Sequence, residues 1–199
     1  MAQKKSCTDA VDLYEDVLKC PGQKRLPGTR AYGWFIRRAY ITKLAEPQKE
    51  AATALKDYLV IKESHTLQAD KKWIRLEFIP DKSSMAPEAQ GEEGSKTMNN
   101  KATVVLPGTE EEQQAVASML LNDDVIVLVP QRNGKVRQFG DDAFTVNVTP
   151  SATTGASVTD ESNTTLEISV ACETMPPFYY GDIVTADGTY SGETCKLKT

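Results

Sequence analysis

The sequence predicts a mainly β protein, built as a β-sandwich or a partly closed barrel with one packed α-helix and a long inter-strand loop. Apolar and polar residues alternate over several short segments, which is the pattern of half-buried strands. Asn133-Gly134 stands between two apolar segments and favours a hairpin turn. Only Glu110–Leu121 combines helical apolar spacing with a clear start signal. About seven to nine strands are expected, and a β-rich chain of 199 residues commonly forms a single domain.

The first third of the chain is expected to supply an arm and short elements. Residues 1–29 form a possible N-terminal arm, within which Thr8–Lys19 has the spacing of a short helix. An aromatic-rich strand is expected at Arg30–Ile41. Three short elements follow: a helix at Glu46–Ala54, a strand at Tyr58–Ile61 and a strand at His65–Gln68.

A clear strand, Lys72–Ile79, precedes a long loop, Asp81–Asn100, and a second strand, Ala102–Leu106. The loop carries few apolar side chains. Loops longer than roughly 12–15 residues are uncommon unless they bind something or are disordered, so this loop is a candidate binding element. Along the first strand two faces alternate, with Ile74, Leu76 and Phe78 on the buried face and Trp73, Arg75 and Glu77 on the other.

The helix at Glu110–Leu121 has the best start signal in the chain. Thr109 and Glu112 have the spacing of a capping box, and the glutamates of the first turn complement the positive end of the helix dipole. The expected buried stripe consists of Val116, Met119 and Leu120, with Ala115 beside it.

The second half of the chain is expected to be a series of strands. Val125–Val129 is apolar on both faces, so it must be covered on both sides by the helix, the opposite sheet or a neighbouring subunit. A type I′ turn at Asn133-Gly134 leads into Val136–Phe139. The remaining segments are Phe144–Thr149 with Val146 and Val148 inward, a polar loop at Pro150–Asp160, Thr164–Ala171 with Leu166, Ile168 and Val170 inward, and a mobile tail at 187–199.

Charge and hydropathy exclude several classes of protein. The net charge is −5 and the sequence pI is about 5.1, which opposes binding to the phosphates of nucleic acid. No apolar run approaches the roughly 18 residues of a membrane helix, and the first residues lack the apolar core of a secretory signal. The protein is therefore expected to be cytoplasmic at synthesis, with no membrane association.

Few residues have the chemistry of an active site. The single histidine, His65, lies in a polar stretch and is expected on the surface or on an edge strand. Asp123-Asp124 and Asp141-Asp142 are interpreted as strand ends near turns, because their oxygens fall short of a full cation shell. The spacing of Cys7, Cys20, Cys172 and Cys195 fits neither a zinc site nor a redox motif. We therefore expect no enzyme, no catalytic or metal-binding residues and no cofactor.

Aromatic residues leave two alternatives open. Phe178, Tyr179 and Tyr180 follow two prolines and form either the anchor of a subunit contact or a cap over the end of the sandwich. Alternatively, Tyr32, Trp34, Tyr179 and Tyr180 are stacking residues of a sandwich that binds a small ligand or a carbohydrate.

The order strand, long loop, strand, helix, strand, hairpin and late strands resembles the tail tube (major tail) proteins of tailed bacteriophages and their relatives in contractile injection systems. Leu106-Pro-Gly-Thr-Glu-Glu-Glu, Asp123-Asp-Val-Ile-Val-Leu-Val and Arg132-Asn-Gly-Lys also resemble segments of structural proteins from prophages of Bacteroides-type bacteria. The turns at Cys20-Pro-Gly22 and Leu26-Pro-Gly28 are similar to the opening of those proteins. The resemblance covers most of the chain, although Glu46–Ala54 has no counterpart in it.

The resemblance implies one tail-tube-like domain over 1–199 and a non-enzymatic virion role. Such subunits form hexameric rings that stack into a tube, with the helix outside and an acidic lumen through which DNA passes without specific binding. It implies a location in the virion tail with other tail proteins as partners; a tube terminator, a decoration protein or a baseplate protein is the alternative. The inter-ring loop would use Asp81, Lys82, Ser83, Ser84, Met85, Gln90, Gly91, Gly94, Lys96 and Asn99, and the ring-barrel strands would present Trp73, Arg75, Glu77, Thr103 and Val105.

The loop is also expected to be mobile in the isolated subunit and ordered only in a tube, because little apolar surface holds it down. A loop that is rigid and packed on its own core would count against the stacking role.

Overall fold

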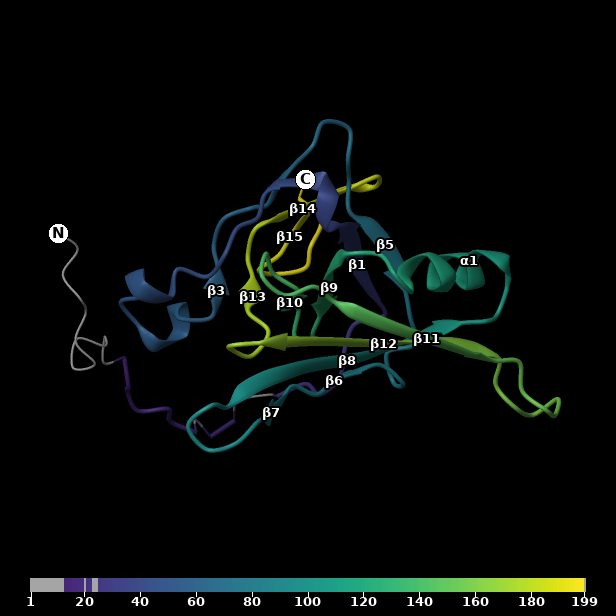
Figure 1. Ribbon diagram of the computed structural model, residues 1–199, viewed down its shortest axis with the longest axis horizontal. Coiled ribbons are helices and arrows are strands. Elements are labelled where there is room, and N and C mark those ends of the chain that lie inside the picture. The colour runs from purple at the N-terminus through teal and green to yellow at the C-terminus, as the bar shows by residue number, and fades with distance from the viewer. Residues whose placement is uncertain (1–12, 20, 23–24, 199) are drawn as a thin grey trace.

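Two open β-sheets face each other, and two short two-stranded sheets form a third layer on the outer side of one of them (Figure 1). The computed structural model describes residues 13–19, 21–22 and 25–198. Within this part of the chain no sheet closes on itself, so the fold is a mainly β sandwich with one helix and not a barrel. The six-stranded sheet has the order β3 (Val60–Ile61), β13 (Phe178–Tyr179), β10 (Val136–Phe139), β9 (Val125–Pro130), β1 (Tyr32–Arg37) and β5 (Ile74–Glu77).

The second sheet carries the long strands. It is antiparallel throughout. Its central pair, β8 and β12, runs in register from Asn163↔Pro107 to Cys172↔Met98. The order is β11 (Asn147–Thr153), β12 (Asn163–Cys172), β8 (Thr97–Pro107) and β6 (Ser84–Met85), and β7 (Glu88–Gln90) also pairs with β8.

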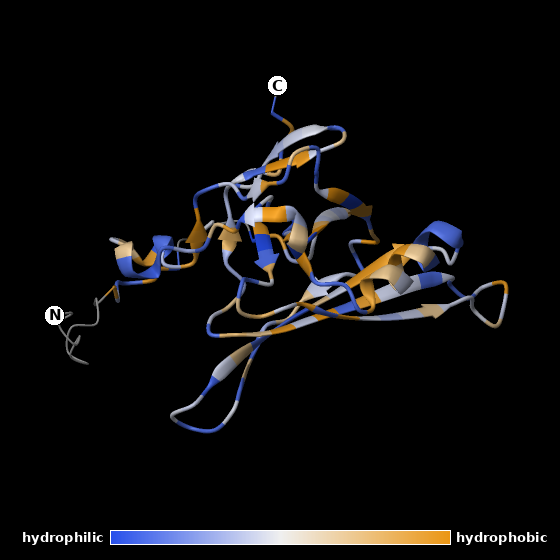
Figure 2. Ribbon diagram, turned by 45° about the horizontal axis from the view of Figure 1, so that its top comes forward, coloured by the Kyte–Doolittle hydropathy of each residue, from blue (hydrophilic) through white to orange (hydrophobic). Residues whose placement is uncertain are grey.

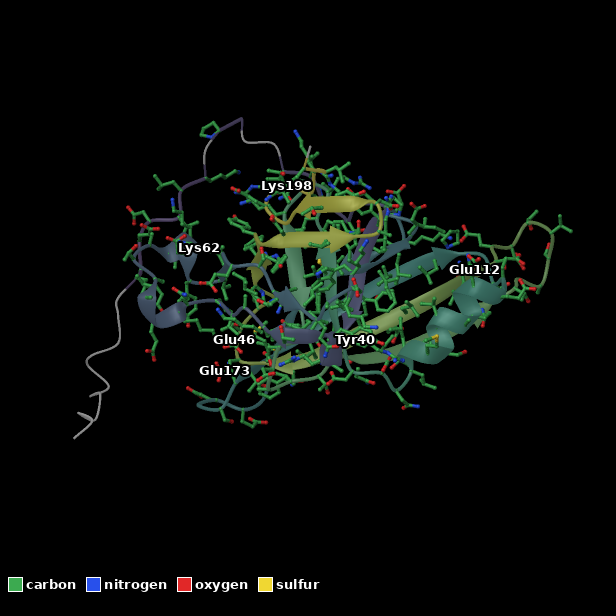
Figure 3. All side chains as sticks on the ribbon, turned by 90° about the horizontal axis from the view of Figure 1, so that it is seen from above. Tyr40, Glu46, Lys62, Glu112, Glu173 and Lys198 are labelled. Carbon is green, nitrogen blue, oxygen red and sulfur yellow. The ribbon has the colours of Figure 1, made fainter. Side chains whose placement is uncertain are left out.

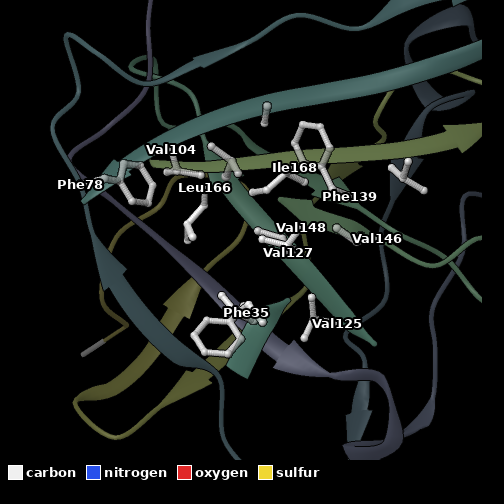
Figure 4. Close-up of a cluster of buried hydrophobic side chains, with 14 of the residues drawn as sticks. Phe35, Phe78, Val104, Val125, Val127, Phe139, Val146, Val148, Leu166 and Ile168 are labelled. Atoms are coloured by element: carbon white, nitrogen blue, oxygen red, sulfur yellow. The ribbon is translucent and has the colours of Figure 1, made fainter. Parts of the chain in front are cut away.

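The core between the two sheets matches the inward faces expected for the late strands. Leu166, Ile168 and Val170 are buried there, as are Val146 and Val148, so both predictions are confirmed. Figure 4 shows Leu166, Ile168, Val146 and Val148 packed beside Val127 and Phe139 of the facing sheet. The strand β11 runs beyond the predicted Thr149 to Thr153 and includes Pro150. Proline, which has no N–H donor, is tolerated there because β11 is an edge strand.

The strand β9 is buried at every position, as its two-faced apolar pattern predicts. Val125, Val127 and Val129 belong to the core between the sheets. Ile126 and Leu128 point to a second core on the outer face of the six-stranded sheet, where they meet Trp34 and Tyr179, among others. Other parts of the same chain therefore cover both faces of β9.

The third layer covers this second core. It consists of the pair β2 (Ile41–Lys43) and β4 (Thr66–Leu67) and the hairpin β14 (Asp182–Thr185) and β15 (Gly188–Ser191). The prediction of a mobile tail is wrong for 187–198. The Lys198 amide donates to the Thr189 carbonyl at 2.7 Å, and the side chain of Cys195 is buried against the second core. The Gly/Thr/Lys-rich composition suggested mobility, but long-range pairing fixes the segment.

The helix α1 (Glu111–Leu120) forms where predicted, with different contacts. The predicted capping box is absent, because the Thr109 hydroxyl bonds to the Ser162 hydroxyl at 3.0 Å and no side chain caps the helix. Leu120 and Ala117 are buried, whereas Met119 is 61% exposed. Ala115 is also exposed, so the helix is rotated relative to the predicted stripe as it packs beside β11 and β12.

Several local predictions need correction. The hairpin between β9 and β10 has a positive φ at Gly134 (93°) but not at Asn133, so it is not a type I′ turn. The Asn133 side chain instead accepts from the Lys135 amide at 3.0 Å. The segment at Glu46–Ala54 forms only a 3-10 turn, Lys49–Ala51, and further 3-10 turns lie at Arg38–Tyr40 and Leu55–Asp57. In Thr8–Lys19, residues 13–19 have no regular structure, and the rest lies outside the described residues.

The strand β5 is shorter than predicted and its faces differ from the expected ones. Leu76 and Phe78 pack into the core between the sheets. Ile74, expected on the same buried face, is 50% exposed. Trp73, expected on the opposite face, is buried in the second core at 3% exposure.

Candidate assembly surface

The segment Asp81–Asn100 is a β-hairpin and not the long loop predicted. Met85 pairs with Ala102, and further out Glu88 pairs with Asn99 and Gln90 with Thr97. Gly91 and Gly94 both have positive φ in the connection, a conformation that costs glycine little. The sequence predicts a loop here because residues 81–96 contain no β-branched or aromatic residues, which are the types that favour strands. The strand β8 supplies the missing stability, since β12 pairs with its other edge.

The outer part of the hairpin lies in solvent. All three residues of β7 are exposed, and so are residues 91–97. Figure 2 shows this hairpin extending from the body of the protein as a largely hydrophilic ribbon. Its charged side chains are Glu88, which pairs with Lys101, and Glu92, Glu93 and Lys96 in the connection. The tip is therefore not packed on the core of the protein.

The base of the hairpin is anchored by one buried hydroxyl. The Ser83 hydroxyl donates to the Ile79 carbonyl at 2.8 Å and accepts from the Val105 amide at 3.1 Å. Asp81 beside it pairs with Arg132 at 2.8 Å, and Lys82 pairs with Glu161. The hairpin is thus fixed at its base and exposed at its end.

Replacing Ser83 with alanine is expected to destabilise the protein by about 1–3 kcal/mol, because the buried Val105 amide loses its acceptor. The free energy of unfolding, measured by chemical denaturation, reports this loss. Ser84→Ala is the matched control at an exposed neighbouring position, and we expect it to change stability by less than about 0.5 kcal/mol. Equal effects of the two substitutions would show that Ser83 does not anchor the hairpin.

The residues predicted to form the ring-barrel strands do not share one sheet. Trp73, Arg75 and Glu77 lie in or beside β5 of the six-stranded sheet, whereas Thr103 and Val105 lie in β8 of the other sheet. The chain crosses between the sheets after β5, where the Ile79 amide donates to the Val105 carbonyl at 2.8 Å. Trp73 and Val105 are buried, so neither side chain lies on the surface of the protein. Glu77 is exposed and pairs with Arg75 at 2.8 Å.

The aromatic residues are mostly core residues. Tyr179 is 0% exposed and Trp34 is 1% exposed, which corrects their assignment as interface or stacking residues. Phe178 is half-buried under the Arg137 guanidinium, which lies 3.5 Å from the ring centroid. Tyr180 and Tyr32 are half-buried. Two of the four aromatic residues proposed to stack on a carbohydrate, Trp34 and Tyr179, are therefore not accessible to a ligand.

Open strand edges are the other candidate contact elements. The edge strands are β3 and β5 in one sheet, and β11 with the β6–β7 side in the other. Unpaired N–H and C=O groups on edge strands pair readily with another chain. Pro150 removes one donor from the edge of β11, and Pro87 interrupts the edge between β6 and β7, whereas β3 and β5 contain no proline.

His65 is buried, contrary to its expected surface position. Its Nδ1 accepts from the Ala45 amide at 2.9 Å, so Nε2 carries the proton and donates to Gln138 Oε1 at 2.8 Å. The ring stacks on Tyr179 with 4.7 Å between centroids. Burial lowers the pKa of His65 to about 4 and raises the pKa of Tyr179 to about 12. No sequence pattern predicts this contact, because its partners lie far apart along the chain.

The remaining candidate groups have structural partners. Asp123 pairs with Arg37 and Asp142 with Arg38, and Asp141 Oδ1 accepts from the amides of Ala143 and Phe144. This agrees with their interpretation as strand ends. Cys172 and Cys195 are free thiols, and burial raises the pKa of Cys172 to about 11; Cys7 and Cys20 lie outside the described residues. Among the described residues, no three His, Cys, Asp or Glu side chains gather as metal ligands.

The fold defines a mainly β, sandwich-like protein with an additional outer layer. A scan against protein-family models found no match, and neither a search of curated proteins nor a search of solved structures found one. In the described part of the chain, no helix is both long enough and apolar enough to span a membrane.

Proposed function

We propose that this protein is a non-enzymatic virion structural protein of a phage or prophage that self-assembles into stacked rings of a tail tube. The observation that carries the proposal is the hairpin at 81–100, which is anchored at its base and exposed along its outer part. An isolated two-stranded hairpin is marginally stable in water. Contact with a neighbouring ring would give its outer part the packing that the subunit does not supply.

The segment was expected to be a mobile loop in the isolated subunit, but its β7 strand is already paired with β8. Only its base is packed on the body of the protein, through the buried Ser83 and through Met85, which packs against the core between the sheets. The outer part, from Glu88 to Thr97, remains free to contact another copy. The proposed stacking surface is therefore narrower than predicted and consists of β7 and the connection at 91–96.

Charge and open edges fit the same role. A net charge of −5 would let DNA pass through a lumen without binding. The free edge of β5 would permit pairing between subunits within a ring, which we propose to be hexameric. The proposed partners are other copies and other tail proteins, first in the cytoplasm and then in the virion tail.

Replacement of Gly91–Lys96 by Asn-Gly tests the role of the hairpin. This change shortens the connection by four residues and keeps the β7–β8 pairing and the buried Ser83. We expect the variant to fold with wild-type stability and to form rings that no longer stack. Negative-stain electron microscopy and light scattering of the full chain measure the assembled state.

Replacement of Gly155–Asp160 by Asn-Gly is the matched control. It removes the same number of residues from the connection between β11 and β12, so we expect it to leave tubes intact. Tubes that persist in the Gly91–Lys96 variant would contradict the stacking role. Single rings that never stack, in the wild-type protein, would favour a tube terminator instead.

A further inference from the structure

A pocket opens at the end of the core between the sheets, away from the exposed outer part of the hairpin at 88–97. Its volume is about 710 Å³, within the range of roughly 300–1,000 Å³ typical of small-molecule sites. Its walls come from the segment at 45–51, the connection at 140–144 between β10 and β11, and residues 172–174 after β12. Glu46 and Glu173, both labelled in Figure 3, lie on the same side of the molecule at its rim.

The pocket lining carries an excess of negative charge. Five carboxylate side chains line it, against one lysine. Lys49 is paired with Glu173 at 3.0 Å, and Arg38 is paired with Asp142. Among the described residues, Glu46 and Asp141 form no ion pair.

A buried oxygen in the same lining also lacks a donor. Asn100 is 1% exposed, and its amide nitrogen donates to the Thr174 carbonyl at 2.9 Å. Its Oδ1 has no hydrogen-bond partner among the described residues. Buried amide oxygens are normally satisfied, so this acceptor indicates a missing donor. Beside it, the half-buried Asp141 receives only a 3.8 Å contact from the Cys172 thiol on its Oδ2.

We propose that this pocket binds a small organic cation, with an ammonium or guanidinium group directed at Asp141 and Asn100. Charged N–H donors match both the unpaired carboxylate and the unsatisfied amide oxygen. Ala45, Pro47 and Pro177 supply apolar wall for an alkyl body. A metal ion fits less well, because no three ligating side chains converge in the described residues, and an anion would meet carboxylates.

Titration with agmatine, which carries both a guanidinium and an ammonium group, tests the proposal. We expect saturable shifts of the Asn100 side-chain amide signals in 1H–15N NMR spectra of the full chain, with a dissociation constant no weaker than about 10 mM. Asp141→Asn keeps the Oδ1 acceptor for Ala143 and Phe144 but removes the charge, so we expect affinity to fall about tenfold.

Two further variants make the result decisive. Glu46→Gln, at an exposed rim position, is expected to weaken binding without affecting folding, even if Asp141→Asn proves unstable. Asp187→Asn removes one charge from an exposed turn away from the pocket and is expected to leave binding unchanged. The proposal is overturned if agmatine leaves the Asn100 signals unshifted, or if all three variants bind it equally.

Discussion

Lowering the pH from about 7.5 to about 4.5 is expected to reduce the free energy of unfolding by about 2–3 kcal/mol through His65 alone. Burial lowers the pKa of His65 to about 4 from its usual 6.5. Between these values the unfolded chain takes up a proton that the folded protein does not. Stability is therefore highest above pH 6.5 and falls as the pH drops toward 4, where the folded state also binds the proton and the loss levels off.

The chain has a single histidine, so no other imidazole contributes to the pH dependence of stability. Denaturant unfolding of the wild-type protein and of His65→Gln at both pH values gives the double difference, in which the carboxylates shared by both proteins cancel. Glutamine does not titrate, so the variant should lack this part of the pH dependence even though it weakens the bonds to Ala45 and Gln138. An imidazole signal in the folded protein that titrates near pH 6.5 would show that His65 is not buried as described.

Phe139→Ala is expected to destabilise the protein by about 3–5 kcal/mol, the range for truncating a buried phenylalanine. The Phe139 side chain is 0% exposed and lies in the core between the sheets, among residues of β8, β9 and β12 (Figure 4). Its removal leaves a cavity that two opposed sheets cannot easily close. The midpoint of chemical denaturation, at unchanged slope, measures the loss.

Phe144→Ala is the matched control, because Phe144 is 40% exposed and lies in the connection before β11. We expect this variant to lose no more than about 1 kcal/mol. If the two variants were destabilised equally, the core between the sheets would not be the main source of stability.

Strands whose apolar residues mark their buried faces could be predicted from the sequence. The continuous apolar run at Val125–Val129 required cover on both faces, and the second core supplies it within the subunit. The alternation at Leu166, Ile168 and Val170 similarly fixed the inward face of β12. In these strands the local apolar pattern matches the side that is buried in the fold, so a short stretch of sequence is sufficient to predict the strand and its buried face.

Elements stabilised by distant pairing could not be predicted. Glu88–Gln90 and Gly188–Ser191 have weak strand patterns and become strands only because β8 and β14 pair with them. The composition of both segments suggested loops.

The candidate sites show the same limit. The Asp81–Asn100 segment was expected to be a long loop, and its hairpin form had no sequence signal. His65 and Asn100 have partners on other elements, 73 residues away at Gln138 and 74 at Thr174. No spacing rule connects such residues, so neither the histidine contact nor the pocket had a sequence signal.

The most direct test of the assembly proposal is the mass and form of the purified full chain across a concentration series, measured by light scattering and negative-stain electron microscopy. The proposal predicts rings at low concentration and stacked tubes as concentration rises, with mass increasing in steps of one ring. A strict monomer at every concentration, which also fails to assemble when other tail proteins are added, would contradict it.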